Sequence, residues 1–482
     1  MDLERLIATL APVEVLHRAP VDVLELAYDT RAVSPGMLFF CVRGERVDGH
    51  DLAGRAVTAG AAALVVERRL DLAVPQLVVA DSRRAMAEAA GEFFGHPSHE
   101  LQVAGVTGTN GKTTTTFLLF AVLAAAGLRP GLLGTVEVRV GGERRPAVRT
   151  TPEAIDLQRT LREMLDAGDR SCALEATSHG SELGRLSGTR FAVLVFTNLT
   201  QDHLDLHGSM ERYFEAKRRL FVEGGPPPAA VNVGDPYGRR LAEELRALDL
   251  APLITFALDG EADLTVEDLE LSRRGAHLTL GGIALDSPLL GRFNVENVLG
   301  TVAAARLLGL PDEAVATGIA SVRGVPGRFE PVDEGQPFLV VVDYSHKPDA
   351  LENALAAARS LAEGRVISVF GCGGDRDRGK RPLMGKAAEE GSDVAILTSD
   401  NPRSEDPEEI AREVLTGVKG DIEVELDRRK AIEQAIEAAR AGDIVLIAGK
   451  GHEQGQESAG KTVPFDDREV ARDALRRLGA RA

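Results

Sequence analysis

The sequence predicts an α/β protein of three domains, with largely parallel sheets covered by helices. Short apolar runs alternate along the chain with segments of helical period that are rich in Ala, Leu, Glu and Arg. Many of these runs show no alternation and end in Gly, Asn or Asp, which is typical of parallel strands buried on both faces. At about 150 residues per domain, 482 residues correspond to about three domains. The expected strands include AALVVE near residue 64, LQVAGVTG at 101–108, FAVLVFTN at 191–198, VISVFG at 366–371, DVAILTSD at 393–400 and DIVLIAG at 443–449.

Two breaks suggest where the domains meet. A helical pattern stops at GHPS, residues 95–98, before a new strand begins, and another stops at GVPG, residues 324–327. The GGPPP stretch at 224–228 also breaks the pattern, but strand-like AAVNV follows at once, so we interpret it as a loop inside a domain. The predicted domains are therefore residues 1–97, 98–324 and 325–482.

Composition and charge exclude several classes of protein. With 44% hydrophobic and 27% charged residues, the chain has the composition of a soluble globular protein. Its net charge of -18 disfavours general binding to nucleic acid or to membrane surfaces. The three cysteines, Cys41, Cys172 and Cys372, lie far apart and suit a reducing compartment. The start of the chain does not resemble a secretory signal, and the apolar run at 117–128 is shorter than the roughly 20 residues that cross a bilayer. We expect a cytoplasmic monomer.

A strand, a glycine-rich loop and a helix predict a phosphate site. The strand LQVAGV continues into TGTNGKTT at 107–114, and a helix follows from about Thr113 to Ala126. Glycines let backbone N–H groups approach phosphate, the helix N-terminus adds partial positive charge, and Lys112 adds a full one. The GxxGKT core is present, although Val106 occupies the first glycine position of the full motif. An ordinary strand-to-helix turn is the alternative. The residues expected to bind ATP are Gly108, Thr109, Asn110, Gly111, Lys112, Thr113 and Thr114.

Polar residues follow two further strands and could bind a metal. Glu175 follows SCAL, and His203 follows FAVLVF within TNLTQDHLDLHG. Both strands should end at the edge that carries the phosphate loop. Phosphoryl transfer requires a divalent ion, so Thr113, Glu175 and His203 are candidate ligands for Mg²⁺. His203 and His207 could instead bind zinc as a helical pair, but without the glutamate of HExxH this pattern is weak, and an ordinary histidine is more common.

Further motifs extend over most of the chain. They are LEATSHG at 174–180, FTNLTQDHLDLHG at 196–208, GRFNVENVLG at 291–300, VDYSHKPDAL at 342–351, FGCGGDRDRGKRPLMG at 370–385, DNPR at 400–403 and AGKGHE at 448–453. Together with TGTNGKTT, and in this order, they strongly resemble the motifs of the Mur ligases. The members that add a diamino acid match best, from residue 28 almost to the C-terminus. The resemblance implies an N-terminal UDP-binding α/β domain, a central P-loop ATPase-like parallel sheet and a C-terminal Rossmann-like ligase domain that binds the amino acid.

The resemblance also implies a reaction. ATP would phosphorylate the D-glutamyl carboxylate of UDP-N-acetylmuramoyl-L-alanyl-D-glutamate, and a diamino acid would attack the acyl phosphate, with ADP and phosphate released, in peptidoglycan precursor synthesis. Such a reaction requires alignment and charge neutralisation more than a protein nucleophile. By the same resemblance, Lys217 in YFEAKRRLF matches a lysine that CO₂ converts into a carbamate, which bridges two Mg²⁺ ions. Taken alone, AKRR on a helix would indicate a solvated face. Lys112, Lys217, Glu175 and His203 are the expected catalytic residues.

The remaining ATP-binding positions lie on both sides of the second predicted boundary. Asn294 and Asn297 match positions on the adenine side, although FN before a helix could only supply an N-cap. Arg328 and Asp343 match residues that bring the last domain onto ATP, so the resemblance implies that the nucleotide is enclosed between domains and shielded from water. Apart from the resemblance, Arg328 could form a surface salt bridge and Asp343 could belong to a turn at the end of a strand. The family motif here is usually DYAHTP, and this chain has Ser345 in place of its Ala and Lys347 in place of its Thr.

Positions for the two other substrates also follow from the resemblance. In the middle domain Leu183 replaces a glutamine that some members have. Arg403 suits a diamino acid with a second, distal carboxylate, namely meso-diaminopimelate, because a guanidinium binds a carboxylate through two hydrogen bonds. The alternatives are L-lysine or L-ornithine as substrate, and a turn in which Arg403 pairs with Glu405 or Asp406. The residues matched to the UDP-linked dipeptide are Tyr28, Thr30, Glu45, Arg46, Val47, Thr150, Thr151, Thr177 and Arg185. Those matched to the diamino acid are Arg376, Asp400, Asn401, Pro402, Arg403, Gly449 and Glu453.

The sequence is also compatible with two other functions. Folylpolyglutamate synthetase has a similar phosphate loop and similar chemistry, but it lacks the N-terminal UDP-type domain and the DNPR motif. A binding module that uses ATP as a switch would need neither an acyl-phosphate site nor an amino-acid pocket.

Overall fold

The structure, a computed structural model, describes residues 1–44 and 47–479. The chain forms two compact units. The first comprises Met1–Thr265 and Leu299–Gly318, and the second comprises Val266–Val298 and Ile319–Ala482. The domain boundaries near residues 97 and 324 stay a prediction. Within the described residues, no helix combines the length and apolar character needed to span a membrane.

The first sheet has the order β1-β5-β4-β3-β2, and only β1 is antiparallel to its neighbour. Leu38 and Phe40 of β3 pack in one core with α1 and α3, whereas Phe39 packs in a second core with α2. Both faces are therefore buried, which explains the continuous apolar run. The elements are α1 (Leu3–Leu10), β1 (Glu14–Leu16), β2 (Glu25–Ala27), η1 (Thr30–Ala32), β3 (Met37–Phe40), η2 (Gly49–Leu52), α2 (Ala53–Thr58), β4 (Ala63–Val66), β5 (Gln76–Val78), α3 (Ser82–Phe93) and η3 (Pro97–His99).

The central sheet places three strand ends side by side. Its order is β13-β12-β11-β6-β10-β7-β8-β9, and it is parallel from β13 to β7. Because β6 lies between β10 and β11, their carboxyl ends meet at one edge, as the sequence predicted. The strands are β6 (Gln102–Thr107), β7 (Pro130–Leu133), β8 (Glu137–Val140), β9 (Glu143–Pro146), β10 (Ser171–Glu175), β11 (Val193–Phe196), β12 (Ala229–Asn232) and β13 (Leu253–Phe256).

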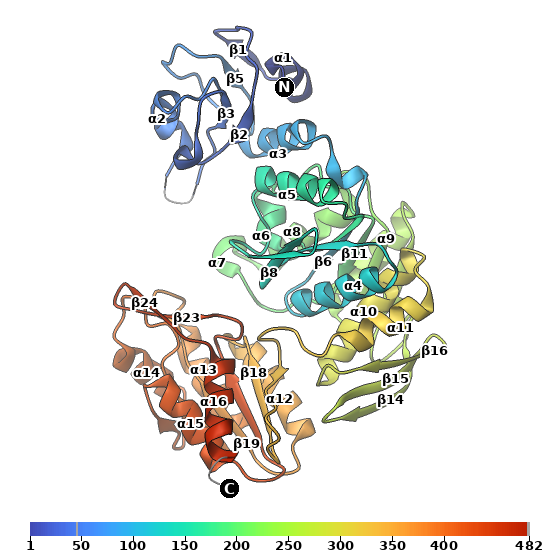
Figure 1. The fold of residues 1–482 in the computed structure, drawn as a ribbon, viewed down its shortest axis with the longest axis vertical. Coiled ribbons are helices and arrows are strands. Elements are labelled where there is room, and N and C mark those ends of the chain that lie inside the picture. The colour runs from blue at the N-terminus through green and yellow to red at the C-terminus, as the bar shows by residue number, and fades with distance from the viewer. Residues whose placement is uncertain (45–46, 480–482) are drawn as a thin grey trace. The chain divides into compact units, whose positions relative to one another are not determined.

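Helices cover both faces of this sheet. Val103, Leu174 and Phe196 pack in one core with α5, α8 and α9. Figure 1 shows α5 and α8 on one side of β6 and α4 on the other. Helix α4 begins at Lys112 and ends at Ala125, one residue earlier at each end than predicted. The helices are α4 (Lys112–Ala125), α5 (Ala154–Asp166), α6 (Ser178–Glu182), α7 (Leu204–His207), α8 (Met210–Val222) and α9 (Pro236–Leu248).

The second unit contains an antiparallel meander, a six-stranded sheet and a hairpin. The larger sheet has the order β17-β18-β22-β19-β20-β21, in which only β17 is antiparallel to its neighbour. Phe370 and Leu446 face the core formed with α12, α13 and α14, and Val369 and Ile447 face the core formed with α15 and α16. The strands are β14 (Val266–Ser272), β15 (Gly275–Leu280), β16 (Ile283–Ser287), β17 (Glu330–Pro331), β18 (Leu339–Asp343), β19 (Val366–Phe370), β20 (Val394–Leu397), β21 (Glu423–Val424), β22 (Ile444–Ala448), β23 (Gly455–Ser458) and β24 (Lys461–Pro464).

Two helices, α10 and α11, begin in one unit and end in the other. The last helices of the chain are α10 (Arg292–Leu307), α11 (Asp312–Ser321), α12 (Pro348–Leu361), α13 (Lys380–Gly391), α14 (Pro407–Leu415), α15 (Arg428–Ala438) and α16 (Asp467–Gly479).

Candidate active site

The phosphate loop is fixed by the end of β11. Gly108 has a φ of 150°, and a Cβ there would lie 1.9 Å from Thr197 Oγ1, so only glycine fits. The N–H groups of Thr109 and Asn110 donate to the backbone and side-chain oxygens of Asn198, at 2.9 and 2.8 Å. Helix α4 begins at Lys112, directly after this loop, and the partial positive charge of a helix N-terminus favours a phosphate there.

Two lysines converge on one carbonyl oxygen of this loop. Lys112 Nζ donates to the carbonyl oxygens of Gly108 and Thr109 at 3.0 and 2.8 Å, and Lys217 Nζ donates to that of Gly108 at 2.7 Å. Lys217 lies on α8 and is only 1% exposed, so the interpretation as a solvated helix face is wrong. Its ammonium lies 4.7 Å from the ring centre of Tyr213, whose hydroxyl is 3.1 Å from Thr109 Oγ1.

Glu175, at the end of β10, is a buried carboxylate with a set of hydroxyl partners. Its Oε2 accepts from Thr113 Oγ1 at 3.1 Å and from Thr135 Oγ1 at 3.0 Å, and its Oε1 accepts from the Thr135 N–H at 2.8 Å. Thr150 Oγ1 lies 3.1 Å from Thr135 Oγ1. Hydroxyl and carboxylate oxygens are the ligands that Mg²⁺ prefers, so Thr113 and Glu175 fit such an ion.

The three histidines near the strand ends lie together. His203 has a left-handed φ of 51°, its Nε2 is 3.2 Å from Asp202 Oδ2, and its ring centre is 4.5 Å from that of His179. His207 is buried with its Nε2 3.1 Å from Ser178 Oγ, and burial, reinforced by His179, lowers its pKa. His207 is thus held as a neutral core histidine, which is the ordinary alternative to a zinc pair. Among residues 1–44 and 47–479, no three His, Cys, Asp or Glu side chains converge as a metal site.

A second polar cluster surrounds the backbone of Glu175. Thr151 Oγ1 donates to the Glu175 carbonyl oxygen at 2.7 Å and lies 2.9 Å from Thr177 Oγ1. Arg185 Nη1 donates to the Thr151 carbonyl oxygen at 3.2 Å, and Arg185 pairs with Glu153 at 2.8 Å. The structure therefore brings Thr150, Thr151, Thr177 and Arg185 together beside the metal candidates.

The N-terminal candidates occupy loops after β2 and β3. The Tyr28 hydroxyl donates to Asp156 Oδ2 on α5 at 2.6 Å, and burial together with this carboxylate raises the pKa of Tyr28. Thr30 begins the short helix η1, and Val47 is 53% exposed. Glu45 and Arg46 lie outside the described residues.

In the second unit, Asn294 and Asn297 lie in the first turns of α10 and are buried. Asn297 Nδ2 donates to Asn294 Oδ1 at 2.9 Å, and Asn294 Nδ2 donates to the Leu290 carbonyl oxygen at 2.8 Å. Because α10 begins at Arg292, Asn294 lies inside the helix, and the N-cap interpretation is wrong.

Asp343 ends β18 and organises the turn that follows. Its Oδ2 accepts from the Phe329 N–H at 2.7 Å and its Oδ1 from the Ser345 N–H at 2.9 Å and from the Ser345 hydroxyl. Burial raises the pKa of Asp343, although Ser345 and Arg328 oppose the shift. Arg328 lies over the Tyr344 ring at 4.8 Å rather than in a surface salt bridge.

The DNPR and AGKGHE motifs form one buried polar cluster. Asn401 Nδ2 donates to Glu453 Oε2 at 2.8 Å, and Lys450 Nζ donates to Asn401 Oδ1 at 2.9 Å. Asp400 is 8% exposed, and within the described chain its Oδ2 has no hydrogen-bond partner. A Cβ at Gly449 would lie 2.6 Å from that oxygen, so the backbone comes close to it.

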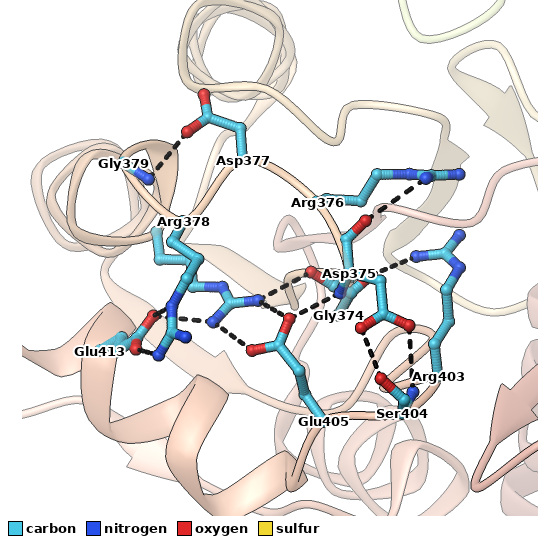
Figure 2. A network of polar contacts seen from close by, with 12 residues as sticks. Gly374, Asp375, Arg376, Asp377, Arg378, Gly379, Arg403, Ser404, Glu405 and Glu413 are labelled. Carbon is cyan, nitrogen blue, oxygen red and sulfur yellow. Dashed lines mark hydrogen bonds and ion pairs between the residues drawn. The ribbon is translucent and has the colours of Figure 1, made fainter. Parts of the chain in front are cut away.

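Arg403 follows this cluster and is held by a neighbouring loop. Its Nη1 donates to the Gly374 carbonyl oxygen at 2.7 Å (Figure 2). Its Nε lies 3.4 Å from Glu457 Oε2. The suggested pairing of Arg403 with Glu405 is wrong, because Glu405 binds Arg381. Arg376 is close by in the same loop as Gly374.

Family models match most of the chain. "Mur ligase family, catalytic domain" matches residues 23–94, "Mur ligase middle domain" matches 106–305, and "Mur ligase, glutamate ligase domain" matches 327–451. A relative from Geobacillus kaustophilus, named UDP-N-acetylmuramoyl-L-alanyl-D-glutamate–2,6-diaminopimelate ligase, is 46% identical over 99% of this chain and 100% of its own. The chain belongs to the Mur ligase family.

Other proteins resemble this Mur ligase over similar lengths. A relative from Solibacter usitatus with the same name is 49% identical over 96% of this chain and 95% of its own. A solved structure of that name is 36% identical, with a TM-score of 0.70 and coverage of 96% of both chains. MurF from Acinetobacter baumannii is 20% identical with a TM-score of 0.67, over 93% of this chain and 95% of its own, and shows the fold alone. The predicted three-domain α/β fold of the Mur ligases is confirmed.

Several polar residues at the site of this Mur ligase escaped the sequence reasoning. Thr135 follows Gly134 at the end of β7, beside β10, so the rule that ligands lie beyond strand ends could have identified it. Asn198, Tyr213 and Lys450 stand within or near the quoted motifs, but their contacts depend on tertiary packing that the sequence does not reveal.

Proposed function

We propose that this Mur ligase adds meso-2,6-diaminopimelate to the D-glutamate of UDP-N-acetylmuramoyl-L-alanyl-D-glutamate, with release of ADP and phosphate. It would act as a monomer in the cytoplasm, in peptidoglycan precursor synthesis. The observation that carries the proposal is full-length similarity: relatives named for the diaminopimelate reaction are 41% to 49% identical over 95% to 100% of this chain.

The phosphate loop supports the first chemical step. A substrate carboxylate oxygen attacks the γ-phosphorus of ATP, and the bond from that phosphorus to the β-phosphate oxygen breaks. The products are ADP and an acyl phosphate. Negative charge accumulates on the transferring oxygens, so a nearby cation and the positive end of a helix dipole stabilise the transition state. Lys112 and the first turn of α4 supply these at the strand edge. Asn294, Asn297, Arg328 and Asp343 are proposed to bind the rest of the nucleotide.

Magnesium and a carbamate at Lys217 belong to the same proposal. Thr113, Glu175 and His203 would hold Mg²⁺ with the carbamate, and the ion would neutralise phosphate charge. Lys217 is suited to this modification because its ammonium and that of Lys112 share one carbonyl acceptor, which places two positive charges close together. Conversion of the Lys217 ammonium into an anionic carbamate would replace that repulsion by attraction.

The acyl donor, the UDP-linked dipeptide, is proposed to bind at the threonine cluster. Thr151, Thr177 and Arg185 form a connected set of hydroxyl and guanidinium groups beside Glu175, where a substrate carboxylate would reach the phosphate loop. Arg185 Nε is buried and makes no hydrogen bond within the described residues. Thr150 completes this set, and Tyr28, Thr30, Glu45, Arg46 and Val47 are proposed to bind the UDP-sugar.

The second unit supports recognition of the diamino acid. Its attacking amine forms a bond to the carbonyl carbon of the acyl phosphate, phosphate leaves, and the nitrogen loses a proton. Asp400 Oδ2 is a buried acceptor that fits an ammonium group, with Glu453 nearby through Asn401. Arg403 and Arg376 suit the distal carboxylate. Pro402 and Gly449 are proposed to shape the pocket.

The decisive experiment offers meso-diaminopimelate, L-lysine and L-ornithine in parallel to the purified chain with ATP, Mg²⁺ and the UDP-linked dipeptide. We expect ADP and a lengthened UDP-peptide, measured by mass spectrometry, with meso-diaminopimelate strongly preferred. Equal turnover of the three amino acids would contradict the proposed specificity for meso-diaminopimelate. ADP release in the absence of the UDP-linked dipeptide would contradict the proposed reaction. The absence of ADP release with every amino acid would also contradict it.

A further inference from the structure

Arg381, on α13, is a fully buried arginine that joins two loops of the second unit. Its side chain is 0% exposed. Nη1 donates to Glu405 Oε2 at 2.9 Å and to Glu413 Oε2 at 2.7 Å, and Nη2 donates to Glu405 Oε1 at 2.8 Å and to the Gly373 carbonyl oxygen at 3.3 Å. Gly373 belongs to the loop at 371–379, after β19, and Glu405 belongs to the loop at 398–406, after β20. One guanidinium group therefore contacts both loops.

The Glu405 carboxylate, which binds Arg381, also binds the backbone of Asp375, a residue in a left-handed conformation. Glu405 Oε1 also accepts from the Asp375 N–H at 2.6 Å, and Asp375 has a left-handed φ of 53°. Asp375 in turn accepts from the Ser404 hydroxyl at 2.6 Å (Figure 2). Residues other than glycine rarely adopt this conformation unless their surroundings impose it. The Arg381 guanidinium lowers the pKa of Glu405 to about 2, so the carboxylate is charged at neutral pH.

These contacts determine where Arg403 points. Arg403 also has a left-handed φ of 53°, and its Nη1 donates to the Gly374 carbonyl oxygen, next to Asp375. The loops touch so closely that a Cβ at Gly374 would lie 1.9 Å from the Pro402 carbonyl oxygen. A shift of either loop would change the position of the Arg403 guanidinium relative to its acceptor on Gly374. A recognition group must be held within about half an ångström to be effective.

We infer that Arg381 is a positioning residue for amino-acid selection: through Glu405 and the Gly373 carbonyl it fixes the loop pair that orients Arg403 toward the distal carboxylate of the diamino acid. The inference rests on the proposed function. A buried ion pair is weak support for stability, because well-packed apolar side chains often do as well, whereas a fixed arrangement of loops is a role that apolar packing would not fill. The planar guanidinium also makes four hydrogen bonds at once, to two carboxylates and a carbonyl, whereas an ammonium has only three N–H donors.

The experiment compares the unmutated chain with Arg381→Lys and Glu405→Gln, by steady-state kinetics in each substrate. For Arg381→Lys we expect KM for meso-diaminopimelate to rise about tenfold, and the preference for meso-diaminopimelate over L-lysine in kcat/KM to fall by a similar factor. KM for ATP and for the UDP-linked dipeptide should stay within about twofold. Glu405→Gln should show the same pattern more weakly, because the amide keeps the shape but loses the charge.

Arg378→Ala is the matched control, because Arg378 pairs with the same Glu413 from the exposed side and, among the described residues, makes no hydrogen bond to Glu405. It should retain unmutated kinetics. Unchanged KM and unchanged preference in both Arg381→Lys and Glu405→Gln would overturn the inference. A parallel change in all three KM values and in kcat would do the same, because it would indicate general loss of structure. If the unmutated chain used no diamino acid, the proposed function itself would fail, and the two failures are thereby distinguished.

Discussion

The buried ammonium of Lys217 illustrates how a single residue acquires its chemistry from its partners. On sequence alone, AKRR on a helix indicates a solvated face. In the structure Lys217 reaches the Gly108 carbonyl oxygen beneath the phosphate loop, while the next residue, Arg218, pairs with Glu244. Lys217 is thus fully buried whereas the adjacent Arg218 is only half-buried, and tertiary contacts decide the difference.

Replacement of Lys217 by alanine should lower ligase turnover by at least about hundredfold, because the proposed carbamate and its charge are lost. A short-chain carboxylate added to the assay should restore part of the activity, since it can occupy the space of the carbamate. The measurement is ADP release with and without added carboxylate. Arg218→Ala is the control and should behave as the unmutated chain. Undiminished turnover by the Lys217 variant would exclude this residue from the mechanism.

Thr135, which no motif suggested, provides a test of the role of the Glu175 carboxylate. Thr135→Val keeps the backbone donor to Glu175 but removes the hydroxyl that donates at 3.0 Å. Loss of such a hydrogen bond costs about 1 kcal/mol, so kcat should fall about fivefold to tenfold with little change in fold. The Mg²⁺ dependence of kcat is the measurement. Thr160→Val, which removes a hydroxyl bonded to a helix carbonyl on α5, should leave kcat unaltered.

At the scale of the elements, the sequence predicts strands and their ends better than their partners. Apolar runs ending in polar residues correctly indicated β6, β10 and β11, and the parallel arrangement brought their ends to one edge. The ion pairs were less accessible. The sequence suggested Glu405 as a partner of Arg403, because the two residues are close in sequence. In the structure, Arg381 of helix α13 binds the Glu405 carboxylate instead. Side-chain pairing depends on how loops pack, which local pattern does not encode.

Helices α15 and α16 are joined by a pair that sequence could not predict. Arg428 and Asp467 are both fully buried, with two hydrogen bonds of 2.7 Å, and Arg428 also donates to the Ala448 carbonyl oxygen at the end of β22. Asp467→Asn should destabilise the chain by about 3–5 kcal/mol, because it leaves a buried cation without its counter-charge. Urea unfolding is the measurement. Arg429→Ala, at an exposed pair 3.9 Å apart, should change stability by less than about 0.5 kcal/mol. A loss below about 1 kcal/mol in the Asp467 variant would contradict the argument.

At the scale of the whole molecule, the response to acid depends on histidines that the second unit holds neutral. Burial, with the nearby charges of Lys347 and Lys380, lowers the pKa of His346 to about 3. Burial, with Arg328 and Arg468 close by, lowers the pKa of His452 to about 4. An unfolded chain binds protons at both histidines below about pH 6.5, whereas the folded chain does so only at much lower pH.

Stability should therefore be complete above about pH 6.5 and decline as the pH falls toward 4, because only the unfolded state gains these protons. At pH 5 the loss should be about 1–2 kcal/mol per histidine after allowance for partial exposure. The measurement is the urea midpoint at pH 7 and at pH 5, followed by circular dichroism because the chain has no tryptophan. The double variant His346→Gln and His452→Gln should show a much smaller difference between the two pH values, and a variant of the exposed His17 should retain the full difference. An equal decline in the double variant and the unmutated chain would assign the acid sensitivity to other groups.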